Sequence, residues 1–376
     1  MKKLLPEVCD IQYGYAFDSA KFSTDQGIPL IRIRDVVRGF SETYTTEVCD
    51  QEYIVNDGDI LIGMDGEFNI ARWKGGKAYL NQRVCRLLPK DEVDALYLYY
   101  FMPKALKTIE DKTPFVTVKH LSAKELNKIV VPVPMFQDQK EISKSLQKLD
   151  DLISLRKQQL SKMDELVKSR FIEMFGDVKT GDYKFETQKL GKVADVGSSH
   201  RVFTTEFVEE GIPFYRGTEI GELANGIKPE NPYRITKEHY ERLACDETKP
   251  KIGDLLMPSI CNKGQIWMVD TDEPFYYKDG RVLCISPNRN LFNCKYLEQF
   301  MREKTLVEYP KLGSGSTFAE FKIFLLKEID VLIPPIELQN QFATFVEQVD
   351  KSKLAIQKSL DQLETLKKSL MQKYFG

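Results

Sequence analysis

The chain has 376 residues, of which 42% are hydrophobic and 29% charged, and its formal net charge at pH 7 is −2. This length fits two or three domains, and the composition is ordinary for a soluble globular protein. No apolar run has the length of a signal-peptide core or of a membrane span, so we expect neither, and a near-neutral charge permits nucleic-acid binding only through basic residues gathered on one face.

Residues 1–136 are predicted to form a first domain of strands and short helices. Alternating apolar residues indicate strands, and apolar residues on a helical face indicate short helices that pack on them. Strands are expected at IPLIRIRDV (28–36), 58–64 and 83–88, and helices at 94–102 and 121–129. The prolines of VVPVPM (130–135) then end the domain, because proline cannot continue a helix.

Residues 137–176 and 336–376 are predicted to be two long helices. Their apolar residues recur in alternating steps of three and four, which is the spacing of coiled-coil heptads. The expected seam residues are Ile142, Leu146, Leu149, Ile153, Leu160 and Met163 in the first helix, and Phe342, Val346, Val349, Ile356, Leu360, Leu363 and Leu370 in the second. Arg156 and Arg170 interrupt the first seam, and Lys353 and Lys367 interrupt the second. These mismatched interruptions favour pairing of the two helices with each other as an antiparallel coiled coil. The alternative is that each helix lies on one globular domain.

The chain contains an internal repeat. Thr117 aligns with Thr317 and Gly176 with Gly376 without a gap, so every pair in between differs by 200. Upstream the match continues in pieces, with Leu5 on Leu190 and Arg83 on Arg281. A rigid repeated segment joined to a variable one predicts an α+β protein with a pseudo-two-fold repeat. In it, two mixed α/β recognition domains are separated by the antiparallel pair of helices.

The second copy follows a short connection. Residues 177–189 are polar and rich in turn-forming residues, and we interpret them as a linker. Residues 190–335 form the second domain, which has larger loops than the first. Domains with different loops are expected to recognise different ligands.

The sequence offers little material for catalysis. It has three histidines, none at a metal-ligand spacing, and its seven cysteines include no CxxC pair. Cys85 and Cys284 are predicted to be buried apolar residues at equivalent strands. GSGST (313–317) lacks the ending of a P-loop, and Glu320-Phe321-Lys322 lacks the other strand of a nuclease site. We therefore predict that the chain has no catalytic residues and binds no metal or cofactor.

Basic, amide and hydroxyl side chains gather in loop-like positions of both predicted domains, beside glycine and aromatic residues such as Trp73. Arginine can pair with guanine and asparagine or glutamine with adenine, while serine, threonine and lysine suit phosphates. Any one of these residues could equally be a solvated surface group. The candidate DNA-binding residues are Arg32, Arg34, Asn69, Arg72, Lys74, Asn81, Gln82, Arg83, Thr117, Lys119, His120, Ser199, His200, Arg201, Arg216, Ser259, Asn262, Lys263, Gln265, Lys278, Arg281, Ser314, Ser316 and Thr317.

These features resemble the specificity subunit of type I restriction–modification systems, the HsdS family. The likeness covers essentially the whole chain and is clearest at 58–87, at 117–142 and in the helical ends FIEMFG and LMQKYFG. The resemblance implies a non-catalytic subunit whose two domains each read one half of a split, asymmetric double-stranded DNA target. It further implies a coiled coil that fixes the spacing between the half-sites.

The same resemblance implies partners and a location. Two methyltransferase subunits would dock on the repeated helices, and motor-nuclease subunits would complete the complex. S-adenosylmethionine, ATP and magnesium would then belong to these partners, in the cytoplasm of a bacterium or archaeon. The alternatives are a coiled-coil scaffold whose domains bind proteins, and a stand-alone nuclease or methyltransferase with a degenerate site.

Overall fold

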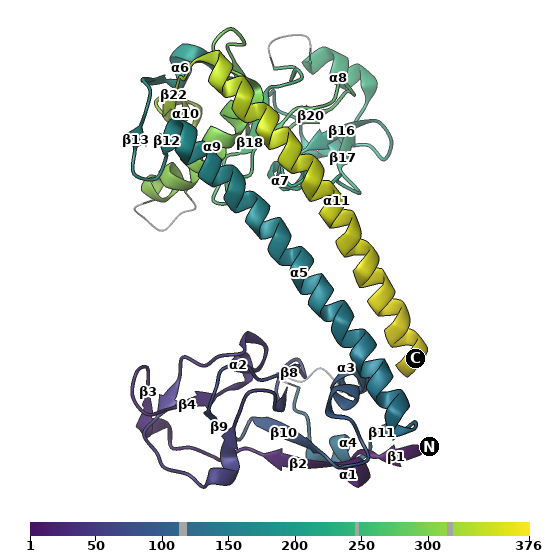
Figure 1. The fold of residues 1–376 in the computed structure, drawn as a ribbon. Helices are drawn as coiled ribbons and strands as arrows, with labels where there is room; N and C mark the ends of the chain where they lie inside the picture. Colours follow the sequence, from purple (N-terminus) through teal and green to yellow (C-terminus); the bar gives the residue numbers. More distant parts are fainter. Residues whose placement is uncertain (113–118, 245–247, 314–318) are drawn as a thin grey trace. The chain divides into compact units, whose positions relative to one another are not determined.

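The computed structural model describes residues 1–112, 119–244, 248–313 and 319–376. These residues form two compact units. Unit 1 consists of Met1–Gln158 and Gln357–Gly376, and unit 2 of Gln159–Ile356. Each unit combines helices with strands, so the predicted α+β class is confirmed (Figure 1).

Unit 1 is built around a four-stranded antiparallel sheet in the order β2-β10-β7-β8, beside a five-stranded sheet in the order β3-β5-β4-β9-β6. A separate pair, β1 and β11, joins the start of the chain to the segment before the first long helix. The strands are β1 (Lys2–Leu4), β2 (Cys9–Tyr13), β3 (Phe22–Ser23), β4 (Ile28–Ile31), β5 (Tyr44–Thr45), β6 (Ile54–Val55), β7 (Ile60–Gly63), β8 (Ile70–Arg72), β9 (Ala78–Leu80), β10 (Val84–Pro89) and β11 (Val130–Pro132).

The helices of unit 1 that precede the first long helix are short, apart from α3. They are α1 (Leu5–Val8), α2 (Ile33–Arg38), α3 (Ala95–Lys112) and α4 (Ala123–Asn127), with 3-10 turns at Ser19–Lys21 and Gln51–Tyr53. Helices α3 and α4 cover the two segments for which helices were predicted. Ser122 starts α4 because its hydroxyl accepts the Glu125 N–H (3.3 Å).

The prediction of one strand over residues 28–36 is wrong in its second half. Strand β4 ends at Ile31 and α2 begins at Ile33. The side chain of Asp35 accepts the backbone N–H of Arg32 (2.9 Å), which satisfies one of the donors that a helix start leaves free. The alternating arginines therefore belong to the start of a helix, not to a strand face.

Unit 2 repeats this plan. Its four-stranded sheet has the order β15-β21-β18-β19, and a three-stranded sheet has the order β17-β16-β20. The strands are β12 (Gly176–Asp177), β13 (Asp182–Tyr183), β14 (Thr187–Lys189), β15 (Ala194–Gly197), β16 (Ile212–Tyr215), β17 (Tyr233–Ile235), β18 (Leu255–Pro258), β19 (Trp267–Met268), β20 (Tyr276–Tyr277), β21 (Val282–Pro287) and β22 (Asp330–Leu332). The helices before the second long helix are α6 (Leu190–Val193), α7 (Gly217–Leu223), α8 (Lys237–Leu243), α9 (Cys294–Glu308) and α10 (Ile323–Lys327), with 3-10 turns at Thr204–Glu206 and Tyr309–Leu312.

The segment 177–189, predicted to be a linker, is an ordered part of unit 2. Strands β12 and β13 form a small hairpin, and β14 pairs with β22. Val178 is 4% exposed, and Tyr183 and Phe185 pack against the core of the unit. Three apolar residues among polar neighbours are enough to anchor the hairpin, although the average composition resembles that of a linker.

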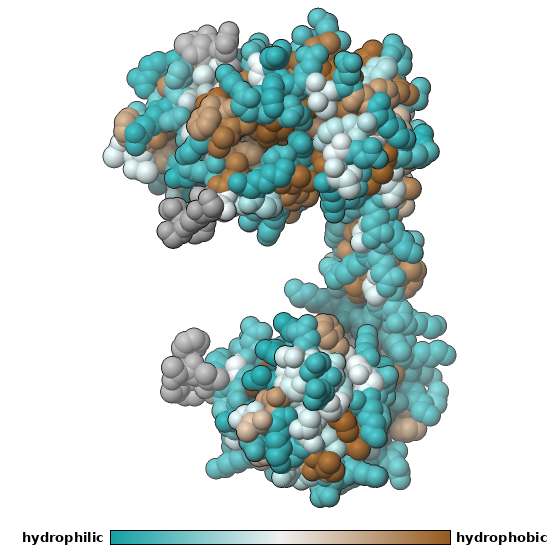
Figure 2. Space-filling model, turned by 90° about the vertical axis from the view of Figure 1, so that its left-hand side faces the viewer, coloured by the Kyte–Doolittle hydropathy of each residue, from teal (hydrophilic) through white to brown (hydrophobic). Residues whose placement is uncertain are grey.

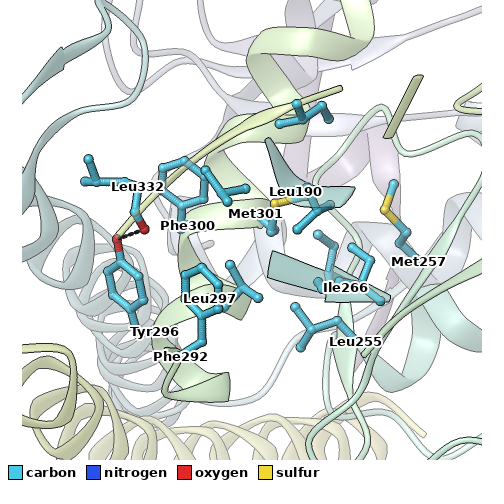
Figure 3. Close-up of a cluster of buried hydrophobic side chains, with 14 of the residues drawn as sticks. Leu190, Leu255, Met257, Ile266, Phe292, Tyr296, Leu297, Phe300, Met301 and Leu332 are labelled. Carbon is cyan, nitrogen blue, oxygen red and sulfur yellow. Dashed lines mark hydrogen bonds between the residues drawn. The ribbon is translucent and has the colours of Figure 1, made fainter. Parts of the chain in front are cut away.

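The largest core of unit 2 lies between α9 and the four-stranded sheet. Figure 3 shows aromatic residues of α9, including Tyr296 and Phe300, beside aliphatic residues of β18 such as Leu255. The Tyr296 hydroxyl donates to the Leu332 carbonyl oxygen of β22 (3.2 Å). In unit 1 the equivalent Tyr97 hydroxyl donates to the Pro132 carbonyl oxygen of β11 (2.8 Å). The repeat seen in the sequence thus extends to individual hydrogen bonds.

The two long helices are α5 (Phe136–Phe175) and α11 (Ile336–Phe375), each of 40 residues. Near the start of α5, Gln139 is fully buried. Its side-chain amide donates to the carbonyl oxygens of Pro134 (3.0 Å) and Glu92 (3.1 Å), and its Oε1 accepts the N–H of Asp94 (2.9 Å). This glutamine joins the helix start to the two segments that flank it.

Gln339 does the same in α11. It is also fully buried, and it donates to the carbonyl oxygens of Pro334 (2.8 Å) and Leu291 (2.9 Å). Its Oε1 accepts the N–H of Asn293 (2.9 Å). We call Gln139 and Gln339 the glutamine clamps, because each ties the start of a long helix to the backbone of its unit.

Hydrophilic residues dominate the faces shown in Figure 2, and hydrophobic residues gather in patches. The most exposed apolar side chains include Phe324 on α10, at 67%, and Leu354 on α11, at 73%. Across the described ranges, no helix is long and apolar enough to cross a membrane.

Candidate nucleic-acid interface

Three loops of unit 1 that carry predicted DNA-binding residues lie together. The Met64 N–H donates to the Arg83 carbonyl oxygen (3.0 Å) and the Leu121 N–H to the Met64 carbonyl oxygen (2.7 Å). The Gly66 N–H donates to the Lys119 carbonyl oxygen (2.9 Å). Backbone hydrogen bonds therefore hold the segments after β7, before β10 and before α4 against one another.

Asp65 lies at the centre of this group of loops. Its carboxylate is 3.4 Å from Arg83 Nη1 and 2.5 Å from His120 Nδ1. The arginine side chain is 55% exposed and the aspartate side chain 20%. A solvent-facing guanidinium is thus held by a carboxylate that is itself mostly covered.

Unit 2 has the same backbone arrangement at the equivalent residues. The Ser259 N–H donates to the Arg281 carbonyl oxygen (2.9 Å), and the Phe321 N–H donates to the Ser259 carbonyl oxygen (2.7 Å). Arg281 Nη1 donates to Glu320 Oε2 (2.5 Å), and its side chain is 57% exposed. We call Arg83 with Asp65, and Arg281 with Glu320, the arginine–carboxylate sites.

Glu320 has further partners. Lys322 Nζ donates to one of its carboxylate oxygens, and the Ser259 hydroxyl donates to the other (3.3 Å). The hydrogen bond from Lys322 and the nearby charge of Arg281 hold the pKa of Glu320 below its usual value, against a smaller opposing effect of burial. The carboxylate therefore stays ionised at neutral pH and keeps Arg281 in place.

The carboxylates of the two sites come from different positions in the sequence. In unit 1 the acid follows β7, and His120 occupies the place that Glu320 has in unit 2. In unit 2 the residue after Ser259 is Ile260, and the acid comes from the segment before α10. The guanidinium is thus paired with an acid from a different segment, and has different polar neighbours, in the two units.

A second predicted arginine lies at the start of a short helix in each unit. Glu219 of α7 accepts the Arg216 backbone N–H (2.8 Å) and pairs with its guanidinium (2.6 Å), which also lies 4.5 Å from the centre of the Tyr233 ring. Burial raises the pKa of Glu219, but hydrogen bonds from Arg216 and from backbone N–H groups outweigh it, so that the net shift is downward. Arg32 at the start of α2 has the equivalent backbone bond to Asp35.

The start of α7 adjoins the arginine–carboxylate site of unit 2. A Cβ added to Gly217 would lie 3.3 Å from Pro258 Cβ and 4.0 Å from the Arg281 carbonyl oxygen. In unit 1 helix α2 lies equally close to β7, since a Cβ added to Gly63 of β7 would lie 3.1 Å from Ile33 Cγ2 of α2. Each unit therefore combines a helix-start arginine with a loop arginine.

The structure leaves most of the remaining predicted DNA-binding residues exposed or half-buried. Those are Arg34, Asn69, Arg72, Lys74, Gln82, Lys119, His120, His200, Arg201, Asn262, Lys263, Gln265 and Lys278. Thr117, Ser314, Ser316 and Thr317 lie outside the described residues.

Three predicted contact residues are buried and serve the fold. The Ser199 hydroxyl donates to the Tyr277 carbonyl oxygen (2.5 Å), and Ser259 is 1% exposed against Glu320. Asn81 is 8% exposed in the loop before β10, where its Oδ1 accepts the Arg83 N–H (3.4 Å). Trp73 is buried as well, and its indole N–H donates to the Gly76 carbonyl oxygen (2.6 Å). These residues therefore use polar atoms for contacts within the protein.

The predicted seam residues of both long helices are all buried or half-buried. The lysines that interrupt the second seam have acidic partners on α5. Lys367 Nζ lies 2.5 Å from Asp150 Oδ1 in unit 1, and Lys353 Nζ lies 2.6 Å from Asp164 Oδ1 in unit 2. In each unit, therefore, the two helices contact one another through charged as well as apolar residues.

Sequence reasoning missed the partners of the arginines. Asp65 and Glu219 were not singled out, and Glu320 with Lys322 was considered only as a nuclease motif. The available signal was an acidic residue next to a predicted basic loop in both copies.

The cysteines and acidic residues that the structure describes do not form a metal centre. Cys85 in β10 and Cys284 in β21 are buried, as predicted. Burial raises the pKa of each thiol to about 12. In the described part of the chain, no three histidine, cysteine, aspartate or glutamate side chains are grouped closely enough to hold a metal ion.

Comparison with known proteins agrees with this fold. Residues 1–164 match the family described as the type I restriction modification DNA specificity domain. The chain is 27% identical to the EcoBI specificity subunit of Escherichia coli, over 99% of this chain and 84% of that protein. It is 24% identical to the MjaVIII specificity subunit of Methanocaldococcus jannaschii, over 91% and 87% respectively. The crystal structure of the type I restriction–modification S subunit from M. genitalium has a similar fold, with a TM-score of 0.57 and 16% identity over 100% of this chain and 96% of that chain.

These relatives are specificity subunits of type I restriction–modification systems. Residues 1–164 of this chain match the DNA specificity domain family, and the likeness to specificity subunits extends over almost the entire chain. The resemblance to the HsdS family drawn from the sequence is thereby confirmed. Specificity subunits are the non-catalytic components of these systems, which is the class predicted for this chain.

Proposed function

We propose that this protein is the DNA-reading subunit of a type I restriction–modification complex and recognises a split, asymmetric target. The domains at 1–136 and 190–335 each read one half of that target. The recurrence of an exposed arginine at the same place in both units, with a differently placed carboxylate, carries this proposal. An arginine can pair with guanine through two hydrogen bonds, and its neighbours decide which bases it accepts.

The difference between the two sites supports an asymmetric target. Arg83 has an aspartate and a histidine beside it, whereas Arg281 has a glutamate and a lysine. Identical sites would favour a palindrome, because each would accept the same bases. Different polar neighbours favour two different half-sites.

The helices at 137–176 and 336–376 form the antiparallel coiled coil that sets the gap between the half-sites. The buried seam residues and the ion pairs Asp150–Lys367 and Asp164–Lys353 support this pairing. Linking two readers by a stiff element also raises the effective concentration of the second contact, so neither half-site needs to bind tightly alone.

The complex is completed by partners in the cytoplasm. Two methyltransferase subunits dock on the repeated helices and motor-nuclease subunits join them. S-adenosylmethionine, ATP and magnesium are bound by those subunits. The absence of a His, Cys, Asp and Glu cluster among the described residues is compatible with this division of labour.

The decisive experiment is methylome sequencing of a strain that expresses this chain with its methyltransferase subunit. The expected result is one gapped, asymmetric motif with modified adenine on both strands. Replacing residues 1–136 with the first domain of another specificity subunit should then change one half of the motif only. A short ungapped palindrome, or a change in both halves, would contradict the proposal.

A protein-binding scaffold is distinguished by the salt dependence of DNA binding. Phosphate contacts release counterions, so affinity for duplex DNA should fall steeply between 50 and 200 mM salt. A scaffold would show no such binding at low salt.

A further inference from the structure

Unit 1 contains a groove of about 710 Å³ that adjoins its arginine–carboxylate site, because His120, the partner of Asp65, is among the lining residues. It is lined by residues of α3, by residues in and just after α4, and by Phe375 at the end of α11. Its apolar surface comes from Phe101, Ala105, Ile109, Ile129 and Phe375. This volume is large enough for two aromatic side chains or a small ligand.

The equivalent place in unit 2 is identified by the repeat. Phe101 of α3 corresponds to Phe300 of α9, as the matching hydrogen bonds of Tyr97 and Tyr296 show. Phe375 at the end of α11 corresponds to Phe175 at the end of α5. The two places can therefore be compared residue by residue.

In unit 2 this place is occupied by the chain itself. The hairpin that follows α5 lays the Tyr183 ring 6.3 Å from the Phe300 ring and the Phe185 ring 6.4 Å from the Phe175 ring. Lys304 of α9 donates to the Tyr183 hydroxyl (3.4 Å). The groove of this fold thus accepts two aromatic side chains that are two positions apart on an extended segment.

The rims of the two grooves differ in charge. In unit 1 Lys104, Lys112 and Lys128 line the groove, and their counterparts in unit 2 are Glu303, Lys311 and Glu328. Lys104 is held at the groove edge because its Nζ donates to the Phe375 carbonyl oxygen (2.6 Å). Against these lysines the groove has one acidic lining residue, Glu125, which pairs with Lys128 (2.6 Å). A segment that suits this rim carries negative charge.

We propose that the unit 1 groove binds a segment of a partner protein with two aromatic residues two positions apart, flanked by acidic residues. The aromatic side chains take the places that Tyr183 and Phe185 have in unit 2. The acidic residues face the lysines of the rim. The groove shares His120 with the arginine–carboxylate site, but the interaction does not depend on the proposed function.

The probe is a fluorescent peptide with the sequence of residues 176–186 in which the lysine at 184 is replaced by glutamate. It keeps the aromatic spacing and adds acidity. Fluorescence anisotropy with the full chain should show saturable binding of this peptide. The same peptide with alanine at 183 and 185 should bind at least about tenfold more weakly, because two buried aromatic anchors are lost.

Two variants of the chain locate the site. Thr108→Trp fills the groove from α3, and Lys112→Glu reverses one rim charge at an exposed position. Both should weaken peptide binding about tenfold or more, and the charge reversal should matter less in high salt. Lys311→Glu changes the equivalent residue of unit 2 and should leave binding unchanged, which controls for general effects of charge. Thermal unfolding of each variant shows whether the fold is kept.

Several outcomes would overturn the proposal. One is equal binding of the aromatic and alanine peptides, and another is binding that survives both Thr108→Trp and Lys112→Glu. Displacement of the peptide by non-specific duplex DNA, together with weaker DNA binding by Lys112→Glu, would make the groove a nucleic-acid surface. Concentration-dependent dimers that Thr108→Trp abolishes would identify a second copy as the occupant.

Discussion

Arg281 Nη1 lies 2.5 Å from Glu320 Oε2, although the two residues are 39 positions apart in the sequence. Backbone bonds from Ser259 to both neighbouring segments create this contact. Arg83 and Asp65 form the corresponding pair in unit 1 at 3.4 Å. Each exposed guanidinium is therefore oriented before any ligand arrives, so less side-chain entropy is lost when it binds.

Replacing either loop arginine should weaken binding to target DNA and relax selectivity in one half-site. Arg281→Ala and Arg83→Ala are each expected to cost about 1–3 kcal/mol, because a bidentate base contact is worth roughly that amount. The measurement is equilibrium binding by the assembled methyltransferase complex to duplexes with single-base changes. Lys237→Ala, an exposed charge on α8, is the control and should have little effect. Equal losses at every base of both half-sites would contradict the assignment.

The carboxylate of Glu320 should make the stability of unit 2 depend on acid pH. Its pKa is lowered in the folded state by Lys322 and Arg281. The stabilisation is therefore complete above the unfolded pKa of about 4.5 and is lost as pH falls through the lower folded value. Urea unfolding of the wild type and of Glu320→Gln should differ at pH 7 and converge in acid. A constant difference at all pH values would show that the effect comes from the shape of the side chain and not from its charge.

Loss of a glutamine clamp should destabilise its own unit strongly. Gln139→Leu and Gln339→Leu each remove three hydrogen bonds between a buried side chain and the backbone, and we expect a cost of roughly 2–4 kcal/mol. Urea unfolding followed by tryptophan fluorescence can report on each unit, because Trp73 lies in unit 1 and Trp267 in unit 2. Gln137→Ala changes an exposed glutamine of the same helix and should cost little. Equal effects of Gln137→Ala and Gln139→Leu would refute the role of the clamp.

The buried thiols of Cys85 and Cys284 should be inert in the native protein and should sensitise it to alkali. Their folded pKa of about 12 lies above the unfolded value of about 9. The unfolded state thus loses these protons first, and the free energy of unfolding falls as pH rises from about 9 to 12. A thiol reagent at pH 8 should label neither residue until the protein unfolds. The double variant Cys85→Ala/Cys284→Ala should show a flatter decline above pH 9.

The long helices were predicted to within a residue or so, because a heptad pattern over 40 positions is an unambiguous signal. The prediction of a strand at 28–36 is wrong in its second half, where the Asp35 side chain stabilises the start of α2. There the hydrogen bond from the Arg32 N–H to the Asp35 side chain favours a helix, although the alternating apolar residues are typical of a strand. The hairpin after α5 was taken for a linker because its anchors, such as Tyr183, are few and widely spaced.

The DNA-binding role of the candidate residues stays a prediction, and their geometry could not be predicted from the sequence. The arginines at 83 and 281 were identified because they recur at matching places. Ser199 and Asn81 looked equally suitable, yet both are buried, and the Ser199 hydroxyl and Asn81 Oδ1 bind the backbone. The carboxylates could not be assigned, since Glu320 reaches Arg281 only through the folding of three separate loops.

The glutamine clamps also bear on how such proteins can be recombined. Each clamp touches only main-chain atoms of its unit, so its bonds are indifferent to the side chains at those positions. A gene crossover placed between a clamp and its unit would therefore leave a foreign domain able to form the same hydrogen bonds to the clamp. The glutamine clamp would therefore accept a domain of new specificity without further changes to the residues around it.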